Sequence, residues 1–573
     1  MATNPQHLSA LRSELKQQRL DGFIIPLTDQ HMSEYVGDYA QRLAWATGFT
    51  GSAGNGVVLA KSAAVFVDGR YVIQVAEQLD ETLVEWHHFE EYPLLKWLTD
   101  KATEGQRIGY DPELATISWE QTTGAALASN GIELIAVDSN PIDAAWMDQP
   151  EASLEKLFAQ PADFAGATPE EKRGHIATAL QEQGAEAAVI GMLDSVAWAL
   201  NIRAADVHCT PVPHAFAILD ANEQATLFVD ERKLDEAVRV HLGNKVRVEP
   251  RTAFYAELEK LGRHGKKILV DPATNNAKIF KTLSDAGATL IEGQDPCILP
   301  KARKNATEQQ GTRDAHIRDG AAVTEFLCWL EQEAPKGQLD ELGAAAKLLE
   351  IREKTGLLKD ISFDTISAAG PHAALPHYRV CAESNLKLEM DRIYLVDSGG
   401  QYRDGTTDIT RTVIVGTPTS EMKDCFTRVL RGHIALGTTR FPKGTSGMAL
   451  DAIARRPLWE VGLDYDHGTG HGVGSFLAVH EGPQRIAKFG TNVPLEAGMI
   501  LSNEPGYYKA GDFGIRIENL VLVQACTQQE ERTMFEFENL TFAPIDRNLI
   551  AAESLGQGEL KCSMSITQLF TRN

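Results

Sequence analysis

Two acidic residues beside strand-like segments constrain this chain more than any other feature of its sequence. Asp397 ends the apolar run 393–396, and Asp408 follows eleven residues later in the stretch 406–415, which is rich in β-branched residues. An Asp-Gly turn signal precedes the second stretch, so the pattern predicts two strands of one hairpin. If the two carboxylates pair near the middle of the ladder, their Cβ atoms lie about 5 Å apart on one face. Carboxylates that close repel, so one must take a proton or a cation must lie between them.

A third strand-like segment, 515–523, carries another acid. Alternation places Arg516 and Glu518 on the face opposite Ile515 and Ile517, within a mainly apolar stretch. A glutamate in such surroundings requires a partner, because an unpaired buried charge is costly. The segment therefore predicts a further acidic position that needs a partner.

Histidines gather close to these acids in the sequence. His467 and His471 lie among four glycines in HGTGHGVG, and glycine this dense favours a loop or strand edge that something approaches closely. A lone histidine is more often structural, but a pair near an acidic hairpin favours a functional site. His377 and His480 stand in turn-rich surroundings, and each could equally be structural.

Together these residues have the composition of a two-metal site. Oxygen ligands with a single nitrogen favour Mn²⁺, Co²⁺ or Zn²⁺, and two ions about 4 Å apart can share carboxylates, activate a bridging water and polarise a carbonyl. The alternative is that acids at strand ends pair with Lys or Arg. The residue types alone indicate metal-assisted hydrolysis and name no substrate. The predicted ligands are Asp397, Asp408, His471, Glu504 and Glu518.

Charge and composition narrow the class of protein. The chain has 55 Lys and Arg against 79 Asp and Glu, a formal charge of −24, which argues against a nucleic-acid partner. Seven scattered cysteines without a CxxC pair indicate a reducing compartment. No apolar run approaches the ~20 residues that span a bilayer. The first segment predicts an ordinary helix, Leu8 to Arg19 with Ser9 as N-cap, and not a signal peptide. We expect a cytoplasmic protein without a membrane partner.

The 573 residues exceed what one core can serve. Residues 1–145 alternate helical and strand-like segments, which is α/β patterning, and 160–300 repeat it weakly, since FVDGR at 66–70 resembles FVDER at 228–232. Long helices are predicted from Thr307 to Ala334 and from Leu339 to Lys354, and shorter ones near 420–436 and 446–455. The sequence predicts domains at 1–145, 160–300 and 305–550, and a tail at 551–573.

Several segments resemble one known family. VDSGGQYRDGTTDITRT, HGTGHGVG, LSNEPGYY and IRIEN are similar to motifs of the aminopeptidase P family, the Xaa-Pro aminopeptidases among the pita-bread metallopeptidases. AWATGFTGSAGN, FVDGRY and DSVAWALNIR extend the resemblance to the long, three-domain cytosolic form. The tail after about Asn548 departs from it, because it lacks the expected aromatic-rich ending, which leaves its contribution to a dimer open.

The resemblance implies two creatinase-type α/β domains followed by an α+β pita-bread catalytic domain. It also implies a homodimer with two manganese ions, Zn²⁺ or Co²⁺ being alternatives, that releases the first residue of peptides with proline second. One metal would be held by Asp397, Asp408 and Glu518, and the other by Asp408, His471, Glu504 and Glu518. Glu504 would also take the proton of the bridging water that attacks the Xaa-Pro bond. By the same resemblance, His377 and His480 would bind substrate and stabilise the oxyanion, His467 and Arg516 would support catalysis, and Arg70 would contact substrate.

Other readings of the same family stay open. A prolidase would use the same ligands on dipeptides only, although the three-domain length argues against it. A non-enzymatic pita-bread protein that binds histones or other partners would usually lack the metal ligands, and creatinase shares the fold without a metal. All five ligand positions are filled in this sequence.

Overall fold

The computed structural model describes residues 3–490, 492–527 and 531–559. The chain divides into two compact units: Met1–Gln160 with Ala167–Cys297, and Pro161–Gly166 with the chain from Ile298 onward. Most of the predicted tail, including Cys562 and the whole end KCSMSITQLFTRN, lies outside the described residues. The domain limits at 145, 160, 300, 305 and 550 stay predictions.

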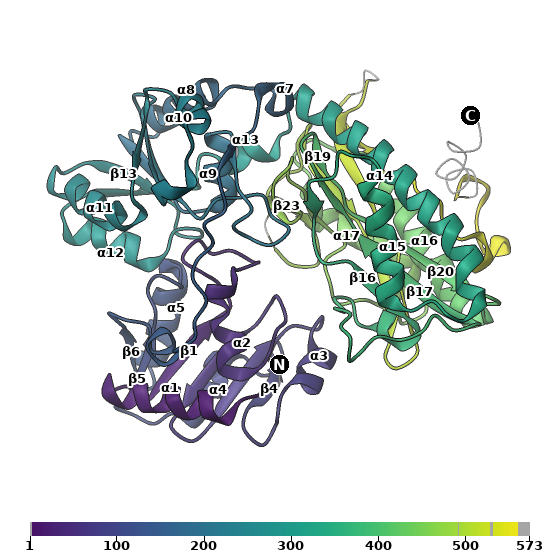
Figure 1. Cartoon of the computed structure of the whole chain (residues 1–573), viewed down its shortest axis with the longest axis horizontal. Coiled ribbons are helices and arrows are strands. Elements are labelled where there is room, and N and C mark those ends of the chain that lie inside the picture. Colours follow the sequence, from purple (N-terminus) through teal and green to yellow (C-terminus); the bar gives the residue numbers. More distant parts are fainter. Residues whose placement is uncertain (1–2, 491, 528–530, 560–573) are drawn as a thin grey trace. The chain divides into compact units, whose positions relative to one another are not determined.

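The first unit contains two six-stranded sheets with the same topology (Figure 1). In both, the first strand along the chain pairs antiparallel with the second and parallel with the fifth, and each edge strand runs parallel to its neighbour. The first sheet has the order β4-β3-β2-β1-β5-β6 and the second β12-β11-β10-β8-β13-β14. The strands are β1 (Gly22–Pro26), β2 (Asn55–Leu59), β3 (Ala63–Val67), β4 (Glu85–His88), β5 (Arg107–Tyr110), β6 (Glu133–Ala136), β8 (Ala187–Ile190), β10 (Phe216–Asp220), β11 (Ala225–Phe228), β12 (Val246–Glu249), β13 (Lys267–Val270) and β14 (Thr289–Glu292).

Helices cover both sheets of this unit, as expected for α/β patterning. The first helix, α1 (Pro5–Gln17), begins earlier than predicted: Asn4, and not Ser9, is its N-cap, because the Asn4 side chain accepts from the Gln6 amide and proline suits the first helical turn. The other helices are α2 (Arg42–Thr47), α3 (Val72–Gln78), α4 (Leu94–Lys101), α5 (Ile117–Ala128), α6 (Pro141–Ala145), α8 (Pro169–Glu182), α9 (Leu193–Ala199), α10 (Glu236–Leu242), α11 (Phe254–Arg263) and α12 (Ala277–Asp285), and a short ladder joins β7 (Phe158–Ala159) to β9 (Ile202–Arg203).

The second unit is built on four long helices close to the predicted positions. The longest, α14 (Ala306–Glu333), starts with a capping box between Asn305 and Glu308 and packs beside α15 (Glu341–Glu353), as Figure 1 shows. The pair α16 (Ser420–Gly437) and α17 (Gly447–Trp459) packs together through buried apolar residues. The short helices α7 (Ala162–Ala165) and α13 (Ile298–Ala302) also belong to this unit.

The sheets of the second unit carry the predicted acids. One has the order β16-β17-β20, and a larger one has the order β21-β28-β27-β24-β22-β23. The stretch 515–523 is not one strand, as its alternation suggested, because it breaks at Ile517–Glu518 between two sheets. The strands are β15 (Asp360–Ile361), β16 (Ile366–Ala369), β17 (Arg392–Ser398), β18 (Gly400–Tyr402), β19 (Gly405–Thr406), β20 (Ile409–Val415), β21 (Phe441–Pro442), β22 (Gly470–Gly472), β23 (Glu481–Ile486), β24 (Ile500–Asn503), β25 (Gly506–Lys509), β26 (Phe513–Arg516), β27 (Asn519–Ala525) and β28 (Met534–Asn539).

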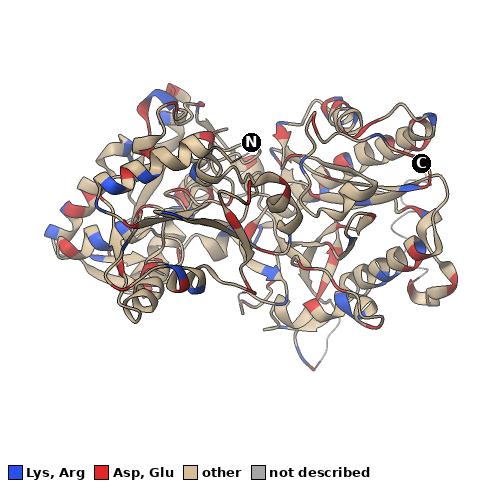
Figure 2. Cartoon of the chain, turned by 90° about the horizontal axis from the view of Figure 1, so that it is seen from below, with Lys and Arg blue, Asp and Glu red and all other residues tan. Residues whose placement is uncertain are grey.

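Acidic and basic residues are interspersed along the helices of both units (Figure 2). Many pair locally, as Lys96 does with Asp100 at 2.8 Å on α4. Six cysteines are described and all have free thiols. Among the described residues, no helix is both long and apolar enough to cross a membrane.

Candidate metal centre

The hairpin formed by β17 and β20 brings the first two acids together. Asp397 pairs with Thr410 and not directly with Asp408, which immediately precedes β20. The predicted hairpin is also longer than one turn, because β18 and β19 are inserted between its strands and form a separate sheet with β15. Asp397 and Asp408 are 6% and 3% exposed. Both carboxylates are therefore held on rigid backbone away from bulk water.

Three further segments carry the remaining predicted ligands. Ligand atoms of Asp408, His471 and Glu518 all lie within 4.8 Å of one another. His471 is on β22, and its Nε2 lies 3.4 Å from Asp408 Oδ2 and 3.5 Å from Oε1 of Glu504, which follows β24. Glu518 sits at the break between β26 and β27, where its backbone amide donates to the Thr410 carbonyl on β20. The strand break at Ile517–Glu518, which the alternation did not predict, places Glu518 beside the hairpin of β17 and β20.

The carboxylates of this cluster raise one another's pKa, so the cluster favours a proton or a cation between them. Burial raises the pKa of Asp408 to about 6, and the charge of Asp397 adds to the rise. Burial and then the charges of Asp408 and Asp397 raise the pKa of Glu518 well above its ordinary value. Burial opposes protonation of His471, but its hydrogen bond to Asp408 and the charge of Glu504 raise its pKa to about 9. The protein thus gathers more negative charge than it neutralises.

The donor atoms fit divalent cations. Asp397 Oδ1, Asp408 Oδ1 and Glu518 Oε1 are buried, and none accepts a hydrogen bond from the described residues. The Nδ1 of His471 lies 2.9 Å from the Gly472 carbonyl, to which it donates, so Nε2 is the ring nitrogen that faces the carboxylates and that would bind a metal once its proton is lost. Oxygen-rich surroundings with one imidazole suit a hard or borderline divalent metal. The residues present therefore fit a metal centre.

A hydrogen-bond relay supports the cluster. Arg516 Nη2 donates to Asp397 Oδ2 at 2.6 Å, and its Nη1 donates to the Tyr508 hydroxyl at 2.6 Å. That hydroxyl lies 2.8 Å from His467 Nε2, and His467 Nδ1 is 3.9 Å from Glu504 Oε2. The predicted supporting residues Arg516 and His467 are thus linked to Asp397, His467 through Tyr508, and Glu504 lies beside this relay, since His467 Nδ1 faces the Gly468 carbonyl at 2.8 Å. Tyr508 was missed by sequence reasoning, although it lies inside the motif NEPGYY.

Thr410 and Ser502 also escaped the sequence prediction. The Thr410 hydroxyl donates to Glu518 Oε2 at 2.6 Å and accepts from Arg516 Nε at 3.2 Å. The Ser502 hydroxyl donates to Glu504 Oε1 at 3.0 Å. In the sequence, the only indication of these two residues is that each is a hydroxyl residue close to a predicted ligand acid. Ser and Thr are so common in strands that this does not distinguish them.

The predicted substrate-binding residues have different positions. The ring of His480 lies 4.3 Å from that of His471, nearly perpendicular to it, so it borders the cluster. His377 follows Pro376, whose carbonyl accepts from Arg516 Nη2 at 3.1 Å. Arg70 belongs to the first unit, where it forms a two-pronged ion pair with Asp68, with a shortest contact of 2.7 Å. A substrate contact of Arg70 stays a prediction.

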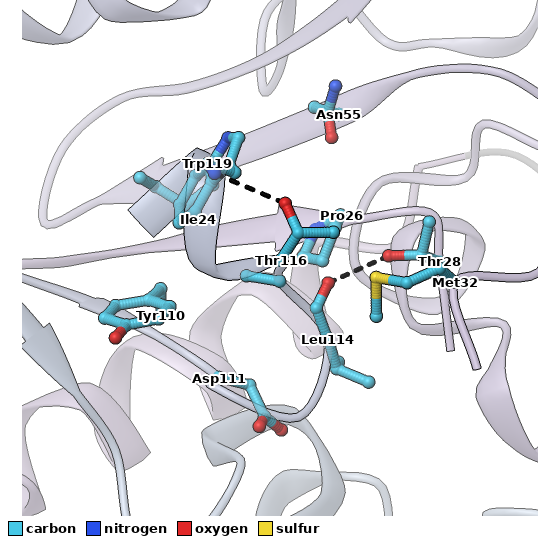
Figure 3. Close-up of a pocket in the computed structure, with 11 residues that line it drawn as sticks. Ile24, Pro26, Thr28, Met32, Asn55, Tyr110, Asp111, Leu114, Thr116 and Trp119 are labelled. Atoms are coloured by element: carbon cyan, nitrogen blue, oxygen red, sulfur yellow. Dashed lines mark hydrogen bonds between the residues drawn. The ribbon is translucent and has the colours of Figure 1, made fainter. Parts of the chain in front are cut away.

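A pocket in the first unit offers no comparable chemistry. It encloses about 160 Å³ near the ends of β1 and β5. Figure 3 shows its polar groups engaged with each other: the Thr28 hydroxyl donates to the Leu114 carbonyl, and the Thr116 side chain accepts from the Trp119 amide. Asp111 accepts from Glu113 and Asn140. The pocket therefore presents a mainly apolar wall without a reactive pair.

Comparisons with known proteins divide the chain into three matched regions. Residues 310–525 match the model of metallopeptidase family M24, and residues 7–144 and 148–308 match two creatinase/prolidase N-terminal domain models. A probable Xaa-Pro aminopeptidase P of Aspergillus niger is 41% identical over 97% of this chain and 93% of its own length. One of Coccidioides posadasii is 42% identical over 97% and 94%.

Solved structures give the same picture. The X-prolyl aminopeptidase of Caenorhabditis elegans, described as a cytosolic enzyme with a di-nuclear active site, superposes with a TM-score of 0.94 at 34% identity, covering 98% of this chain and 94% of that one. A prolidase of Pyrococcus horikoshii has a TM-score of 0.52 at 25% identity and covers 66% of this chain, although all of its own. The three-domain length is therefore shared with the former and not with the latter.

Proposed function

This chain belongs to the Xaa-Pro aminopeptidase P family of metallopeptidases, and from that premise we propose that it releases the N-terminal residue of peptides whose second residue is proline. Membership confirms the predicted fold, two creatinase-type α/β domains before a pita-bread domain. The observation that carries the proposal is the convergence of ligand atoms of Asp408, His471 and Glu518 within 4.8 Å of one another, from three separate parts of the sheets.

The family and the di-nuclear relative support two divalent ions as the cofactor. We assign Asp397, Asp408 and Glu518 to one ion, and Asp408, His471, Glu504 and Glu518 to the other, with manganese as the metal. When bound, such a pair would acidify a water molecule and polarise the scissile carbonyl. The unpartnered oxygens of Asp397, Asp408 and Glu518 support this assignment.

The protein's own groups supply the rest of the chemistry. Glu504 accepts the proton of the attacking water, and the Ser502 hydroxyl at 3.0 Å holds its carboxylate in place. His377 and His480 bind the peptide and stabilise the developing oxyanion. An Xaa-Pro bond is a tertiary amide without an N–H, so a site that polarises the carbonyl directly suits it better than one that needs an extended, hydrogen-bonding backbone.

Three further properties belong to the proposal. We infer a cytoplasmic location from the free thiols and from the relative that is described as cytosolic. We expect a homodimer, as the family resemblance implies. Proline-containing peptides are the expected partners, with Arg70 contributing to their binding.

Product analysis tests the activity. Purified protein is stripped with a chelator, reloaded with Mn²⁺, Co²⁺ or Zn²⁺, and incubated with Arg-Pro-Pro and with Xaa-Pro dipeptides. We expect metal-dependent release of free arginine from the tripeptide. Glu504→Ala is the matched control, because it keeps the fold and should lower the rate by about 10³-fold or more, which excludes a contaminating peptidase.

Each other outcome has a definite meaning. Cleavage of dipeptides alone would make the protein a prolidase. No hydrolysis with any metal would refute an enzymatic function and favour a binding protein. Near-normal turnover by Glu504→Ala would remove Glu504 from the role of base.

A further inference from the structure

A fully buried carboxylate outside the metal cluster gathers four hydrogen bonds. Glu341, the first residue of α15, is 0% exposed. Its Oε1 accepts from the Ala369 amide at 2.7 Å and from His372 Nδ1 at 2.8 Å. Its Oε2 accepts from the Leu386 amide at 2.9 Å and from the Tyr378 hydroxyl at 3.0 Å. None of these partners is a lysine or arginine, so the four donors themselves compensate the buried charge.

All four donors lie on one segment, 369–386. Ala369 ends β16, His372 lies in the short 3₁₀ turn η5 (Gly370–Ala374), and Leu386 is near the segment's end. The Glu341 backbone also donates to the Leu386 carbonyl at 3.0 Å. One carboxylate thus ties the start, middle and end of a stretch that has little regular secondary structure to hold it.

His377 lies inside this segment, between two anchored neighbours. On one side, Tyr378 donates its hydroxyl to Glu341. On the other, the Pro376 carbonyl accepts from Arg516, which also donates to the ligand Asp397. The backbone at His377 is therefore fixed from α15 and from the metal cluster at once. Arg516 belongs to the site already described. Glu341 does not, and it is connected to His377 through Tyr378 and the rest of the segment 369–386.

We propose that Glu341 is the positioning residue for His377. It holds the segment 369–386 so that the His377 imidazole meets the peptide, without touching substrate itself. The inference deepens the proposed function and rests on it, because it assumes the substrate contact of His377. A displacement of about 1 Å at such a group can lower a rate about 10²-fold.

Glu341→Gln is the sharpest change. Glutamine keeps the shape but has only one acceptor oxygen. Its NH₂ group would therefore face two of the four donors and could not accept their hydrogen bonds. We expect kcat/KM for Arg-Pro-Pro to fall about 10- to 100-fold in the manganese-loaded protein, with metal content unchanged, because no proposed ligand lies on the segment. Tyr378→Phe removes a single donor and should give a smaller loss in the same direction. This variant serves if Glu341→Gln fails to fold.

A double-mutant cycle separates positioning from general stability. If Glu341 acts through His377, the double variant Glu341→Gln/His377→Ala should be no slower than His377→Ala within about twofold, because the function is already lost. The same holds for Tyr378→Phe/His377→Ala. Independent, multiplying losses in either cycle would overturn the proposal.

Hydrogen exchange provides a readout that does not need activity. Amides of residues 370–386 should exchange at least tenfold faster in Glu341→Gln than in the unmodified protein, while those of β17 and β20 stay protected. Ser367→Ala is the matched control, since Ser367 donates to the Glu341 backbone carbonyl and not to its carboxylate. Unchanged exchange in 370–386, or equal loosening in the control, would overturn the inference even if the unmodified protein proved to be no peptidase.

Discussion

Thr410 has more influence on the metal cluster than its small side chain suggests. Its hydroxyl donates to Glu518 Oε2 and accepts from Arg516 Nε. In the ladder between β17 and β20, Thr410 is also the residue that pairs with Asp397. One oxygen therefore orients the proposed ligand Glu518 and the guanidinium that supports a second proposed ligand, Asp397. Hydrogen bonds of this kind typically change metal affinity 10- to 100-fold, by about 1.4 kcal/mol per tenfold step.

Thr410→Val should weaken metal binding without unfolding the protein. The two side chains have similar shapes, but valine leaves Glu518 without its donor. We expect the free Mn²⁺ concentration for half-maximal activity to rise about tenfold, measured in chelator-buffered metal. Metal content after dialysis should fall in parallel.

Thr406→Val is the matched control. Thr406 is equally buried, but its hydroxyl donates to Gln401 and not to a ligand acid. The control should keep the original metal dependence. Equal shifts in both variants would show that loss of any buried hydroxyl loosens the strands, and the specific role of Thr410 would be wrong.

The predicted ligands could be picked out from the sequence, but the residues that support them in the structure could not. Asp397, Asp408 and Glu518 stand out because a carboxylate is costly in an apolar strand. Glu341 does not stand out, because an acid in the first turn of a helix is ordinary and its burial depends on a segment 28 to 45 residues away. Tyr508 and Thr410 are equally ordinary in strands.

At the scale of elements, β26 lies against η5 with no room between them. A Cβ on Gly514 would be 1.6 Å from the Ala373 carbonyl oxygen and 2.3 Å from its carbon. The contact requires glycine, since backbone atoms cannot rotate away as a side chain can. Because η5 belongs to the segment 369–386 and ends three residues before His377, this packing also holds the part of the segment that precedes His377.

Gly514→Ala should push η5 away from β26. We expect a loss of about 1–3 kcal/mol in unfolding free energy, and a rise in KM for Arg-Pro-Pro that exceeds the change in kcat. Chemical denaturation and steady-state kinetics measure the two effects. Gly511→Ala is the control: it lies in the turn between β25 and β26 at φ +74° with no close neighbour, so it strains the hairpin without displacing η5. A rise in KM in the control as large as in Gly514→Ala would contradict the packing argument.

The elements show why the fold was more predictable than the site's geometry. Periodicity located α14 to within a residue at each end, because capping and a long apolar stripe are local features. The alternation of apolar and polar residues gave no sign of the strand break at Ile517 and Glu518, because that break arises where two sheets meet. The pairing of Asp397 with Thr410 could not be predicted either, because β18 and β19 are inserted between the two strands and the local turn signal does not show them.

At the scale of the whole molecule, the two α/β domains of the first unit are joined by a buried histidine. His31 Nδ1 lies 2.8 Å from the Gly191 carbonyl, and its Nε2 lies 2.9 Å from Arg251 Nη2. The carbonyl requires a proton on Nδ1 and the guanidinium requires a lone pair on Nε2, so the neutral ring alone satisfies both. Burial, and then the charge of Arg251, lower the pKa of His31 to about 3, against the opposing charge of Asp29.

His214 reinforces this dependence on a neutral ring. It stacks at 6.3 Å from His31. Burial lowers its pKa to about 4, with Asp206 and Asp29 opposing and Arg251 and Lys233 adding to the decrease. In the unfolded chain both histidines take a proton near their ordinary pKa of 6.5, whereas in the folded unit they do not. The unfolded state therefore binds more protons below pH 6.5, and stability falls as the pH drops from 6.5 toward 3.

We expect each of these histidines to remove about 2 kcal/mol of stability between pH 7 and pH 5. Urea unfolding followed by tryptophan fluorescence can measure the loss, because most tryptophans belong to the first unit: Trp45, Trp86, Trp97, Trp119, Trp146 and Trp198. His31→Gln is the decisive variant, since glutamine can still donate to Gly191 or accept from Arg251 but cannot titrate. Its unfolding midpoint should be lower than that of the unmodified protein at pH 7, and its decrease toward pH 5 should be about half as steep. An unchanged pH slope in His31→Gln would show that the interface tolerates a charged ring, and that the join between the two domains does not depend on a neutral His31.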